Sequence, residues 1–417
     1  MKKLFILVLA LVMVFAALPA FAQQKADWSF YGSVRMWTSY DWIDTNTPPA
    51  LSSSTLQPGQ VNTFQIASTP AVARIVGGQA QDDSELEWLM QSNSRIGAKV
   101  AWGNIGGAFE YGHGSGNAVQ TRLLYGTWNF GSGTFLVGQD YGPYFYLVSG
   151  LCGPGGGECN GIGFGSIYSS RTPQLKLIFG GFQVSLESPV KTGSFHANQP
   201  PLTITDQELP LFQFATANVP TDNDQTLPRI AASYTFNMGP GQFFIGGIYN
   251  TYTQHFGTTV DVENDVNAWL LGAGTKLGFG PFYVNATFQY GYNPNNAAGP
   301  FFTLYPSAQY YSAALDKSED SKYMAAQLIL GFKLTDSMTF EGGVIWQSGE
   351  VDNPDVSGNN IKQDTWSYYI GMGFSPAKNV FIVPELGLID YNKLKTNSGD
   401  VSFGNLTWFG IKWQINF

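Results

Sequence analysis

Apolar and polar residues alternate along this chain from near its start to its last residue. In WFGIKWQINF (408–417) the apolar residues Phe409, Ile411, Trp413, Ile415 and Phe417 are separated by polar or small ones. Successive side chains of a β-strand point to opposite faces, so this segment is predicted to be a strand with one apolar and one polar face. The same period recurs in segments such as WSFYGSVRMWTSYDW (28–42), PFYVNATFQYGY (281–292), 324–334 and 363–374. An all-β protein is expected.

The first residues have the organisation of a secretory signal peptide. Lys2 and Lys3 precede an apolar run that ends at Leu18, and Ala20–Phe21–Ala22 supplies the small residues of a cleavage site. A membrane anchor would need about 20 apolar residues, and Pro19 interrupts the run. We expect cleavage after Ala22, which leaves residues 23–417 as one mature domain.

Composition favours a membrane β-barrel over a soluble exported protein. Charged residues make up 12% of the chain and aromatic residues 15%, and there are 49 glycines. A soluble domain carries about 25% charged residues. A barrel wall lowers that fraction because lipid-facing apolar residues alternate with lumen-facing polar ones. No later stretch has the length and hydrophobicity of a transmembrane helix, so strands must form the wall.

Short and long connections alternate strictly between the patterned segments, as they do in outer-membrane barrels with short periplasmic turns and long extracellular loops. Closure is required because an open edge in lipid leaves backbone groups unpaired. The last strand, with Trp413, Ile415 and Phe417, is expected to close the barrel on the first. The pattern is weak at 105–113, 133–140 and 265–279, so fourteen or eighteen strands are the alternatives to sixteen. The segments predict sixteen antiparallel strands near 28–43, 85–102, 105–113, 119–130, 133–140, 167–179, 181–188, 228–237, 242–256, 265–279, 281–292, 321–334, 337–348, 363–375, 379–391 and 402–417.

The stretch TRLLYGTWNFGSGTFLVGQDYGP (121–143) resembles the bacterial general-diffusion porins. In that family an arginine-bearing strand, a glycine turn and a G-T-x-x-x-G-Q/R strand lead into a long third loop. NSRIGAKV (93–100) and YSSRTPQLKLIFGGFQ (168–183) are similar to the second and sixth strands of the family. The terminal Phe417 matches the aromatic end by which such proteins are recognised for barrel assembly.

The resemblance implies a sixteen-stranded outer-membrane barrel whose third loop folds into the pore. It implies passive diffusion of small hydrophilic solutes, a homotrimer, surrounding lipid and lipopolysaccharide, and recognition by the barrel-assembly machinery. One departure concerns the third loop, which carries only Glu158, with Asp140 at its entry, where the family has an acidic cluster. A substrate-specific channel, or a surface-binding protein or adhesin acting through the loops at 44–84 and 189–227, are the alternatives.

The phase of the strands assigns charged residues to the lumen, Arg229 and Glu341 among them, because a charge on the lipid face costs about 2–4 kcal/mol at the membrane midplane. Arg171 precedes Thr172–Pro173, where a bulge is expected, and is still predicted to point inward. A basic wall opposite the third loop would select among ions, although the arginines could equally be solvated without a special role. The net charge of −9 and the acidic loops favour cations instead. The predicted pore-lining residues are Arg35, Arg95, Lys99, Glu110, Arg122, Asp140, Glu158 and Arg171.

Cys152 and Cys159 are the only cysteines and are expected to form a disulfide, because exported proteins meet an oxidising compartment. With no histidine beside them they make a poor metal site, and no cofactor motif is present. Catalysis would need a nucleophile and a base, and Ser115 near His113 is the only suggestive pair. We expect no enzymatic activity, and the chain has no basic stretch for nucleic acid.

Overall fold

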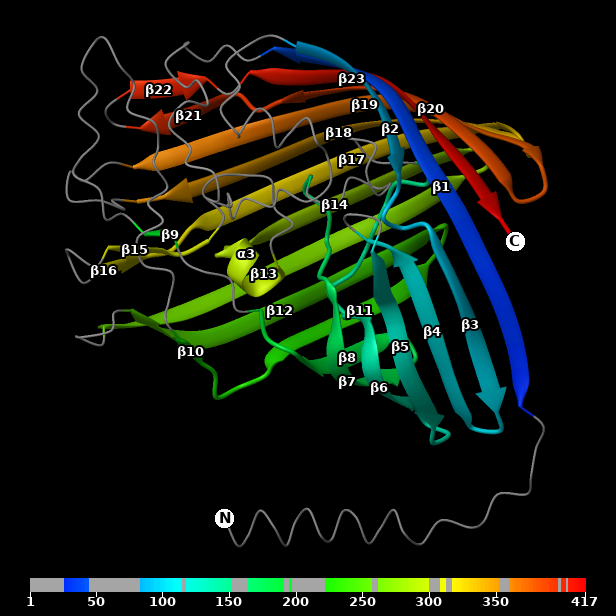
Figure 1. The fold of residues 1–417 in the computed structure, drawn as a ribbon, viewed down its shortest axis with the longest axis horizontal. Helices are drawn as coiled ribbons and strands as arrows, with labels where there is room; N and C mark the ends of the chain where they lie inside the picture. The colour runs from blue at the N-terminus through cyan, green and yellow to red at the C-terminus, as the bar shows by residue number, and fades with distance from the viewer. Residues whose placement is uncertain are drawn as a thin grey trace, which may run out of the picture.

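The computed structural model describes residues 26–44, 83–114, 118–151, 164–190, 195–196, 222–256, 262–299, 308–312, 317–352, 360–396, 399–402 and 404–417. In these ranges the chain forms a closed antiparallel β-barrel of sixteen strands, as predicted (Figure 1). The wall strands are β1 (Asp27–Asp44), β2 (Asp83–Met90) continued by β3 (Arg95–Trp102), β4 (Ile105–His113), β5 (Val119–Asn129), β6 (Thr134–Tyr141), β7 (Arg171–Phe179), β8 (Phe182–Glu187), β11 (Arg229–Met238), β12 (Gly241–Phe256), β13 (Val262–Phe279), β14 (Phe282–Tyr292), β17 (Lys322–Thr335), β18 (Met338–Val351), β19 (Ile361–Ala377), β20 (Val380–Asp390) and β23 (Asn405–Asn416).

The barrel closes where the last strand pairs with the first. Residues Asn405–Asn416 of β23 lie antiparallel to residues 33–44 of β1, with Ile415 opposite Val34 and Trp413 opposite Met36. The backbone of Phe417 both donates to and accepts from Gly32, at 3.0 and 2.7 Å. A Cβ at residue 32 would lie 2.4 Å from the Phe417 ring, so a larger residue there would force that ring to move. The chain end is therefore held in the ladder.

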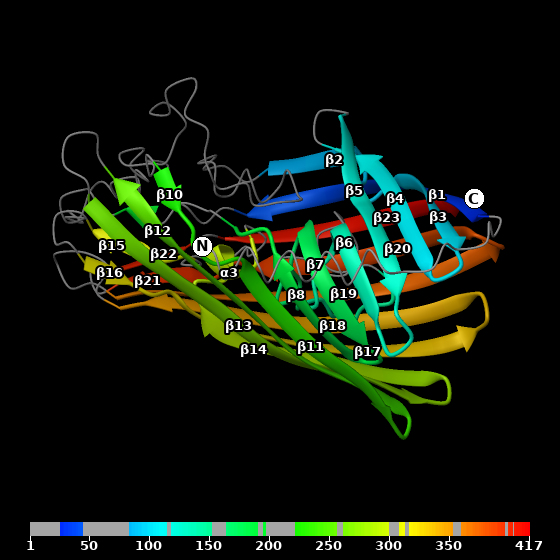
Figure 2. The same ribbon diagram turned by 90° about the horizontal axis from the view of Figure 1, so that it is seen from below.

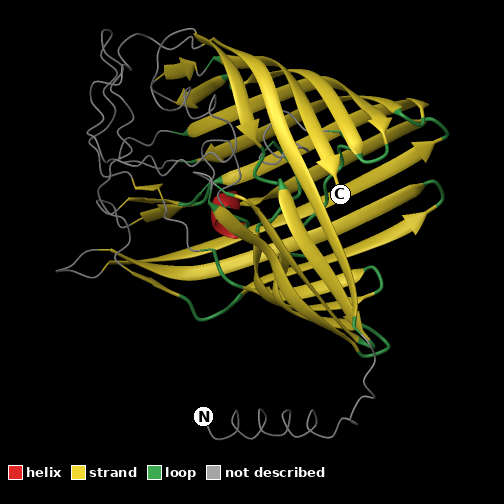
Figure 3. Ribbon diagram, turned by 45° about the vertical axis from the view of Figure 1, so that its right-hand side comes forward, coloured by secondary structure: helices red, strands yellow, loops and turns green. Residues whose placement is uncertain are grey.

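The short turns gather at one end of the barrel and the long connections begin at the other (Figures 2 and 3). The short turns, such as those between Trp102 and Ile105 and between Phe279 and Phe282, need two residues each. The remaining described elements belong to the long connections. They are β9 (Phe195–His196), β10 (Asp222–Asp224), α3 (Pro294–Ala297), β15 (Tyr310–Ser312), β16 (Lys317–Glu319), β21 (Lys393–Thr396) and β22 (Gly399–Ser402). No helix within the described ranges is long and apolar enough to cross a membrane.

Alternate residues of each strand face outward, and most outward residues are apolar. On β13, Leu271 is 58% exposed whereas its inward neighbour Leu270 is fully buried. Outward aromatic rings form two zones. Phenylalanines near the short turns pair with one another or with tryptophan, as Phe282 does with Phe332 at 4.8 Å and Phe130 with Trp128 at 5.6 Å. Tryptophans and tyrosines pair near the long connections, as Trp269 and Tyr292 do at 5.4 Å.

Two strand predictions need correction. The segment predicted as a single strand at 85–102 is interrupted at 91–94, and β2 and β3 pair one after the other with β1. The bulge expected at Thr172–Pro173 is absent, because β6 and β7 keep a regular register through both residues. Proline has no backbone N–H, and the Pro173 carbonyl still accepts from the Ser188 backbone N–H at 2.8 Å.

The bulge of this region lies in β5. Glu110 of β4 pairs with Leu123 and Tyr111 pairs with Thr121, so Arg122 is an extra residue inserted between these two pairs of the ladder. Leu124 faces outward, and a regular strand would therefore place Arg122 outward as well. The bulge reverses that phase and turns the guanidinium into the barrel.

Candidate functional site: the constriction between loop 3 and the basic patch

Loop 3 is the connection between the end of β6 at Tyr141 and the start of β7 at Arg171. It crosses the lumen from the side of β1–β7, which we call the near wall, and packs on the side of β11–β14 and β17–β19, which we call the far wall. Tyr144 donates a hydrogen bond of 2.7 Å to the Gln289 side chain of β14. The Tyr146 ring stacks on Phe244 of β12 at 4.8 Å. Tyr144, Tyr146, Val148 and Ile167 belong to one apolar cluster with residues of β11–β13 and β17. Burial raises the pKa of the Tyr144 hydroxyl well above its ordinary value, so it stays protonated and remains a donor.

Ser149 and Gly150 of loop 3 are bound by one carboxylate, that of Glu341 on β18. The Gly150 backbone N–H donates to Glu341 Oε2 at 2.8 Å, and the Ser149 hydroxyl donates to Oε1. The hydroxyls of Tyr283 and Tyr369 donate to the same carboxylate, each at 2.7 Å. Glu341 is 1% exposed, so these donors replace the water that a buried charge loses.

Further side chains of the barrel wall, three on the far wall and one on β23, bind the backbone of loop 3. Asn285 donates to the Val148 carbonyl at 2.7 Å and Gln289 to the Gly165 carbonyl at 2.8 Å. Gln327 donates to the Phe164 carbonyl at 2.6 Å and Lys412 of β23 to the Leu151 carbonyl at 2.9 Å. The described parts of loop 3 are therefore bound from β14 across to β23.

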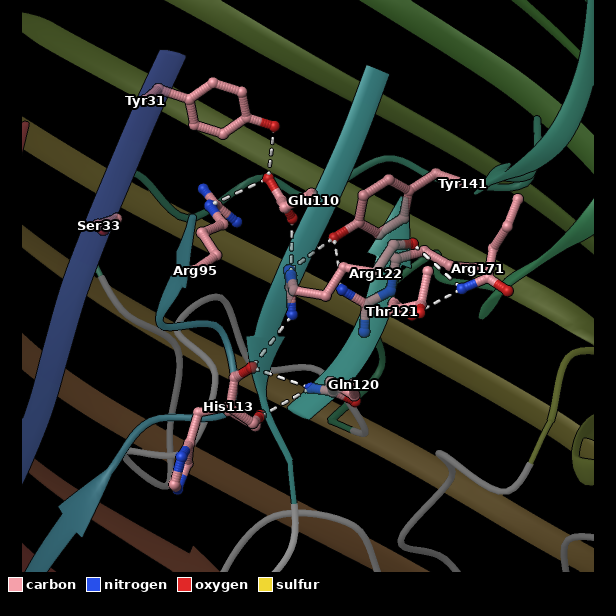
Figure 4. A network of polar contacts seen from close by, with 12 residues as sticks. Tyr31, Ser33, Arg95, Glu110, His113, Gln120, Thr121, Arg122, Tyr141 and Arg171 are labelled. Carbon is pink, nitrogen blue, oxygen red and sulfur yellow. Dashed lines mark hydrogen bonds and ion pairs between the residues drawn. The ribbon is translucent and has the colours of Figure 1, made fainter. Parts of the chain in front are cut away.

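The near wall carries a polar network built on Glu110 of β4 (Figure 4). Its carboxylate accepts from Arg122 Nε at 2.7 Å and from the Tyr31 hydroxyl at 2.9 Å, and Arg95 Nε lies 3.5 Å away. The Arg122 side chain is 1% exposed and that of Arg95 is 27% exposed. Arg122 is thus a buried ion-pair partner, whereas Arg95 reaches the open lumen.

A second part of the network lies where loop 3 leaves the wall. Arg122 and Arg171 both approach the Tyr141 hydroxyl, at 3.2 and 3.5 Å. The Arg171 guanidinium lies 5.3 Å from the centre of the Tyr141 ring. Lys176 binds the Asp140 carboxylate at 2.6 Å and the Tyr141 carbonyl at 2.8 Å. Asp140, predicted to line the pore, is thus paired at the base of loop 3.

The other predicted cations complete what we call the basic patch. Arg35 of β1 donates to the Ser33 hydroxyl at 3.0 Å and is partly exposed. Lys99 of β3 is exposed, with its ammonium 5.9 Å from the Tyr31 ring centre. The basic patch comprises Arg35, Arg95, Lys99 and Arg171.

Not every predicted site residue joins this constriction. Glu158, Cys152 and Cys159 lie outside the described residues, so the disulfide stays a prediction. Phe145 of loop 3 packs on Tyr141 and Tyr168 at 4.5 and 5.7 Å. Arg229 faces inward as its phase predicts, but it is fully buried against Glu187 at 2.6 Å.

Sequence reasoning missed the role of Glu341 in loop 3. Its inward phase was visible, and a carboxylate in the middle of a strand, amid the glycines and apolar residues of FEGGVIW (340–346), was the available signal. Which loop it would bind was not visible.

A closed antiparallel barrel with an apolar outer surface, a polar lumen and a loop bound across it defines a transmembrane channel. Comparison with known proteins agrees. The family model of the Gram-negative porins matches residues 8–394, and the chain belongs to that family. It forms a channel for passive diffusion in the bacterial outer membrane.

Solved structures share this fold at low sequence identity. The outer membrane channel DcaP of Acinetobacter baumannii is 16% identical, with a TM-score of 0.60 over 96% of this chain and 100% of that one. Outer-membrane expressed OmpT of Vibrio cholerae is 13% identical, with a TM-score of 0.52 over 96% and 100%. An anion-selective porin from Comamonas acidovorans is 12% identical, with a TM-score of 0.53 over 94% and 100%. No curated protein matches the sequence.

Proposed function

We propose that small hydrophilic solutes and ions cross the barrel between loop 3 and the basic patch, with anions favoured. The observation that carries this is the asymmetry of burial across the lumen. The apolar side chains of loop 3 are buried on the far wall, while Arg35, Arg95, Lys99 and Arg171 keep solvent exposure on the near side. Water and solutes therefore pass along the near side.

The anion preference follows from how the charges pair. Glu110 is bound by Arg122, Asp140 by Lys176 and Glu187 by Arg229. Each of these three carboxylates is thereby paired with a cation at short range. Arg35, Arg95 and Arg171 add positive charge beside the network of Glu110 and Tyr141. Lys99 pairs with Ser29 and adds its charge nearer the short turns. Asp41 and Glu87 also face inward. They lie six and four residues from the level of Arg35 along β1, which is roughly 13–20 Å at 3.3 Å per residue. Glu341 and Glu385 also face inward, but both are 1% exposed, and tyrosine hydroxyls and the Trp408 indole N–H donate to their carboxylates.

Planar-bilayer recording of the purified protein tests the channel. We expect stepwise openings with a linear current–voltage relation and no saturation by small sugars or organic acids. Saturation by one solute class would favour the substrate-specific channel. Absence of openings from a correctly folded barrel would favour the surface-binding protein and would contradict the proposal.

We further propose a homotrimer, after cleavage of the signal peptide at Ala22 and insertion by the barrel-assembly machinery among outer-membrane lipid and lipopolysaccharide. In support, a trimer form of Vibrio cholerae OmpT has a similar fold, with a TM-score of 0.53. We also propose that the chain has no enzymatic activity, in keeping with its family. The mass of the detergent-solubilised mature protein, measured by light scattering and mass spectrometry, tests both the trimer and the cleavage site.

A charge on the outward face should destabilise the barrel far more than one in the lumen. Leu328 of β17 pairs with Ala286 of β14, between the levels of the Phe282–Phe332 pair and of Tyr292, and is 48% exposed on that face. Leu328→Lys is expected to lower the free energy of unfolding in lipid vesicles by about 2–4 kcal/mol, the cost of a lysine at the membrane midplane. Urea unfolding in vesicles measures it, with Leu328→Met as the matched control. A loss below about 1 kcal/mol would show that Leu328 does not face lipid at the midplane.

A further inference from the structure

The connection between β14 and β17, which we call loop 6, also enters the barrel. Its short helix α3 lies on the inner side of β12 and β13, within the ring of strands (Figure 3). Asn293 begins the turn with a left-handed backbone, φ 54°. Ala297 and Ala298 are fully buried in the same apolar cluster as Ala268 and Leu270 of β13. Asn295 on this turn remains partly exposed.

A network of buried amides binds loop 6 to the wall. Asn250 of β12 donates to the Asn296 carbonyl at 2.7 Å, and the Asn296 side chain donates to the Tyr252 hydroxyl at 2.8 Å. The backbone N–H of Gln309 donates to Asn296 Oδ1 at 2.9 Å. Asn293 donates to the Asn267 carbonyl at 2.9 Å. Asn250, Asn293 and Asn296 are all 0% exposed. Such a satisfied network holds a segment in one position.

The strongest interaction at the end of α3 is a buried ion pair. Arg229 of β11 binds Glu187 of β8 with both side chains 0% exposed. The same guanidinium lies 3.4 Å from the carbonyls of Ala297 and Ala298, the last residues of the helical turn. Glu187 also borders loop 3, since a Cβ at Gly142 would lie 2.3 Å from its Oε1. Arg229 therefore holds the end of α3 beside the base of loop 3.

We propose that α3 forms a second, fixed constriction in the half of the lumen nearest the long connections, and that Arg229 is its positioning residue. The helix occupies space along β11–β13 that solutes would otherwise fill on their way to loop 3. Arg229 cannot act on passing ions, because its charge is buried and paired with Glu187. It acts instead on the width of the passage, and so on the size of solute that can enter from the long-loop side. The proposal rests on the channel function above, but its readout is independent of ion preference.

Polymer exclusion from one side of a bilayer tests the proposal. Polyethylene glycols of increasing size are added to the long-loop side, and the largest polymer that still lowers the conductance gives the cutoff. The first variant is the double substitution Glu187→Met/Arg229→Met, which removes the pair without leaving one charge buried alone. The second deletes residues 295–298. The control is Glu350→Met/Lys362→Met. It removes a half-exposed ion pair, with 3.7 Å between Lys362 Nζ and Glu350 Oε2, at the end of β18 and the start of β19.

Both variants are expected to shift the cutoff on the long-loop side to larger polymers, with the cutoff on the short-turn side and the reversal potential unchanged. The control should match the wild type. An unchanged cutoff in the deletion variant would overturn the second constriction. A larger cutoff in the deletion but not in a folded double variant would overturn the role of Arg229. Openings in the wild type verify the channel separately, so the two failures are distinguishable.

Discussion

Replacing Glu341 by alanine is expected to release Ser149 and Gly150 of loop 3 from the far wall and to give a larger and noisier conductance than the wild type. The carboxylate accepts from Ser149, Gly150, Tyr283 and Tyr369. Its loss leaves the buried Tyr369 hydroxyl without this acceptor, at about 1–3 kcal/mol, and removes the hydrogen bonds that hold the two loop residues. These residues would then leave the far wall and fluctuate in the passage. Single-channel recording measures both the mean conductance and the excess current noise.

The matched control for this change is Glu350→Ala on the same strand. Glu350 lies 3.7 Å from Lys362 and its side chain is 34% exposed, so its loss should cost about 0–1 kcal/mol and leave the conductance unchanged. Equal conductance and noise in Glu341→Ala and the wild type would mean that loop 3 is not held by Glu341.

Replacing Arg122 by leucine should be the most destabilising single substitution on the near wall. It would leave Glu110, which is 4% exposed, as a buried carboxylate without its closest cation. Breaking a buried pair in this way costs about 3–5 kcal/mol. The bulge would also lose the polar side chain that it turns inward. The free energy of unfolding in urea, measured by tryptophan fluorescence in vesicles, gives the effect.

Two companion variants separate pairing from packing. Glu110→Gln/Arg122→Met removes both charges and should recover most of the lost stability, because no charge remains buried alone. Arg95→Met removes a guanidinium that is 27% exposed and 3.5 Å from the same carboxylate, and should cost about 0–1 kcal/mol. Equal losses for Arg95→Met and Arg122→Leu would contradict the assignment of Arg122 as the buried partner.

The strand pattern was largely predictable because every wall strand separates two environments. Because the two faces of each strand meet different surroundings, apolar residues recur at every second position. This alternation could be recognised even at 105–113, 133–140 and 265–279, where it is weak. The interruption at 91–94 was not legible, because a strand can break while its neighbours keep their register. The inward-facing apolar residues Tyr323, Ala325 and Ile329 were also unexpected. They belong to the apolar cluster that also contains residues of loop 3 and of α3.

The site was predictable in its residue types but not in its pairings. Phase placed Arg95 and Arg229 in the lumen alike, yet one is partly exposed and the other is fully buried. The difference is α3, whose position depends on contacts between segments far apart in the chain. Arg122 was placed inward by the cost of a charge in lipid, and the bulge that achieves this has no signature in the local sequence. Long-range pairing of this kind is set by the folded barrel.

The most direct test of the central claim, that solutes pass beside the basic patch, is the reversal potential across a potassium chloride gradient. We predict that the wild type prefers chloride, and that Arg35→Gln/Arg95→Gln/Arg171→Gln shifts the reversal potential toward the potassium side while the channel stays open. These three arginines are chosen because each retains solvent exposure. A wild type that prefers potassium, or a triple variant with an unchanged reversal potential, would contradict the account.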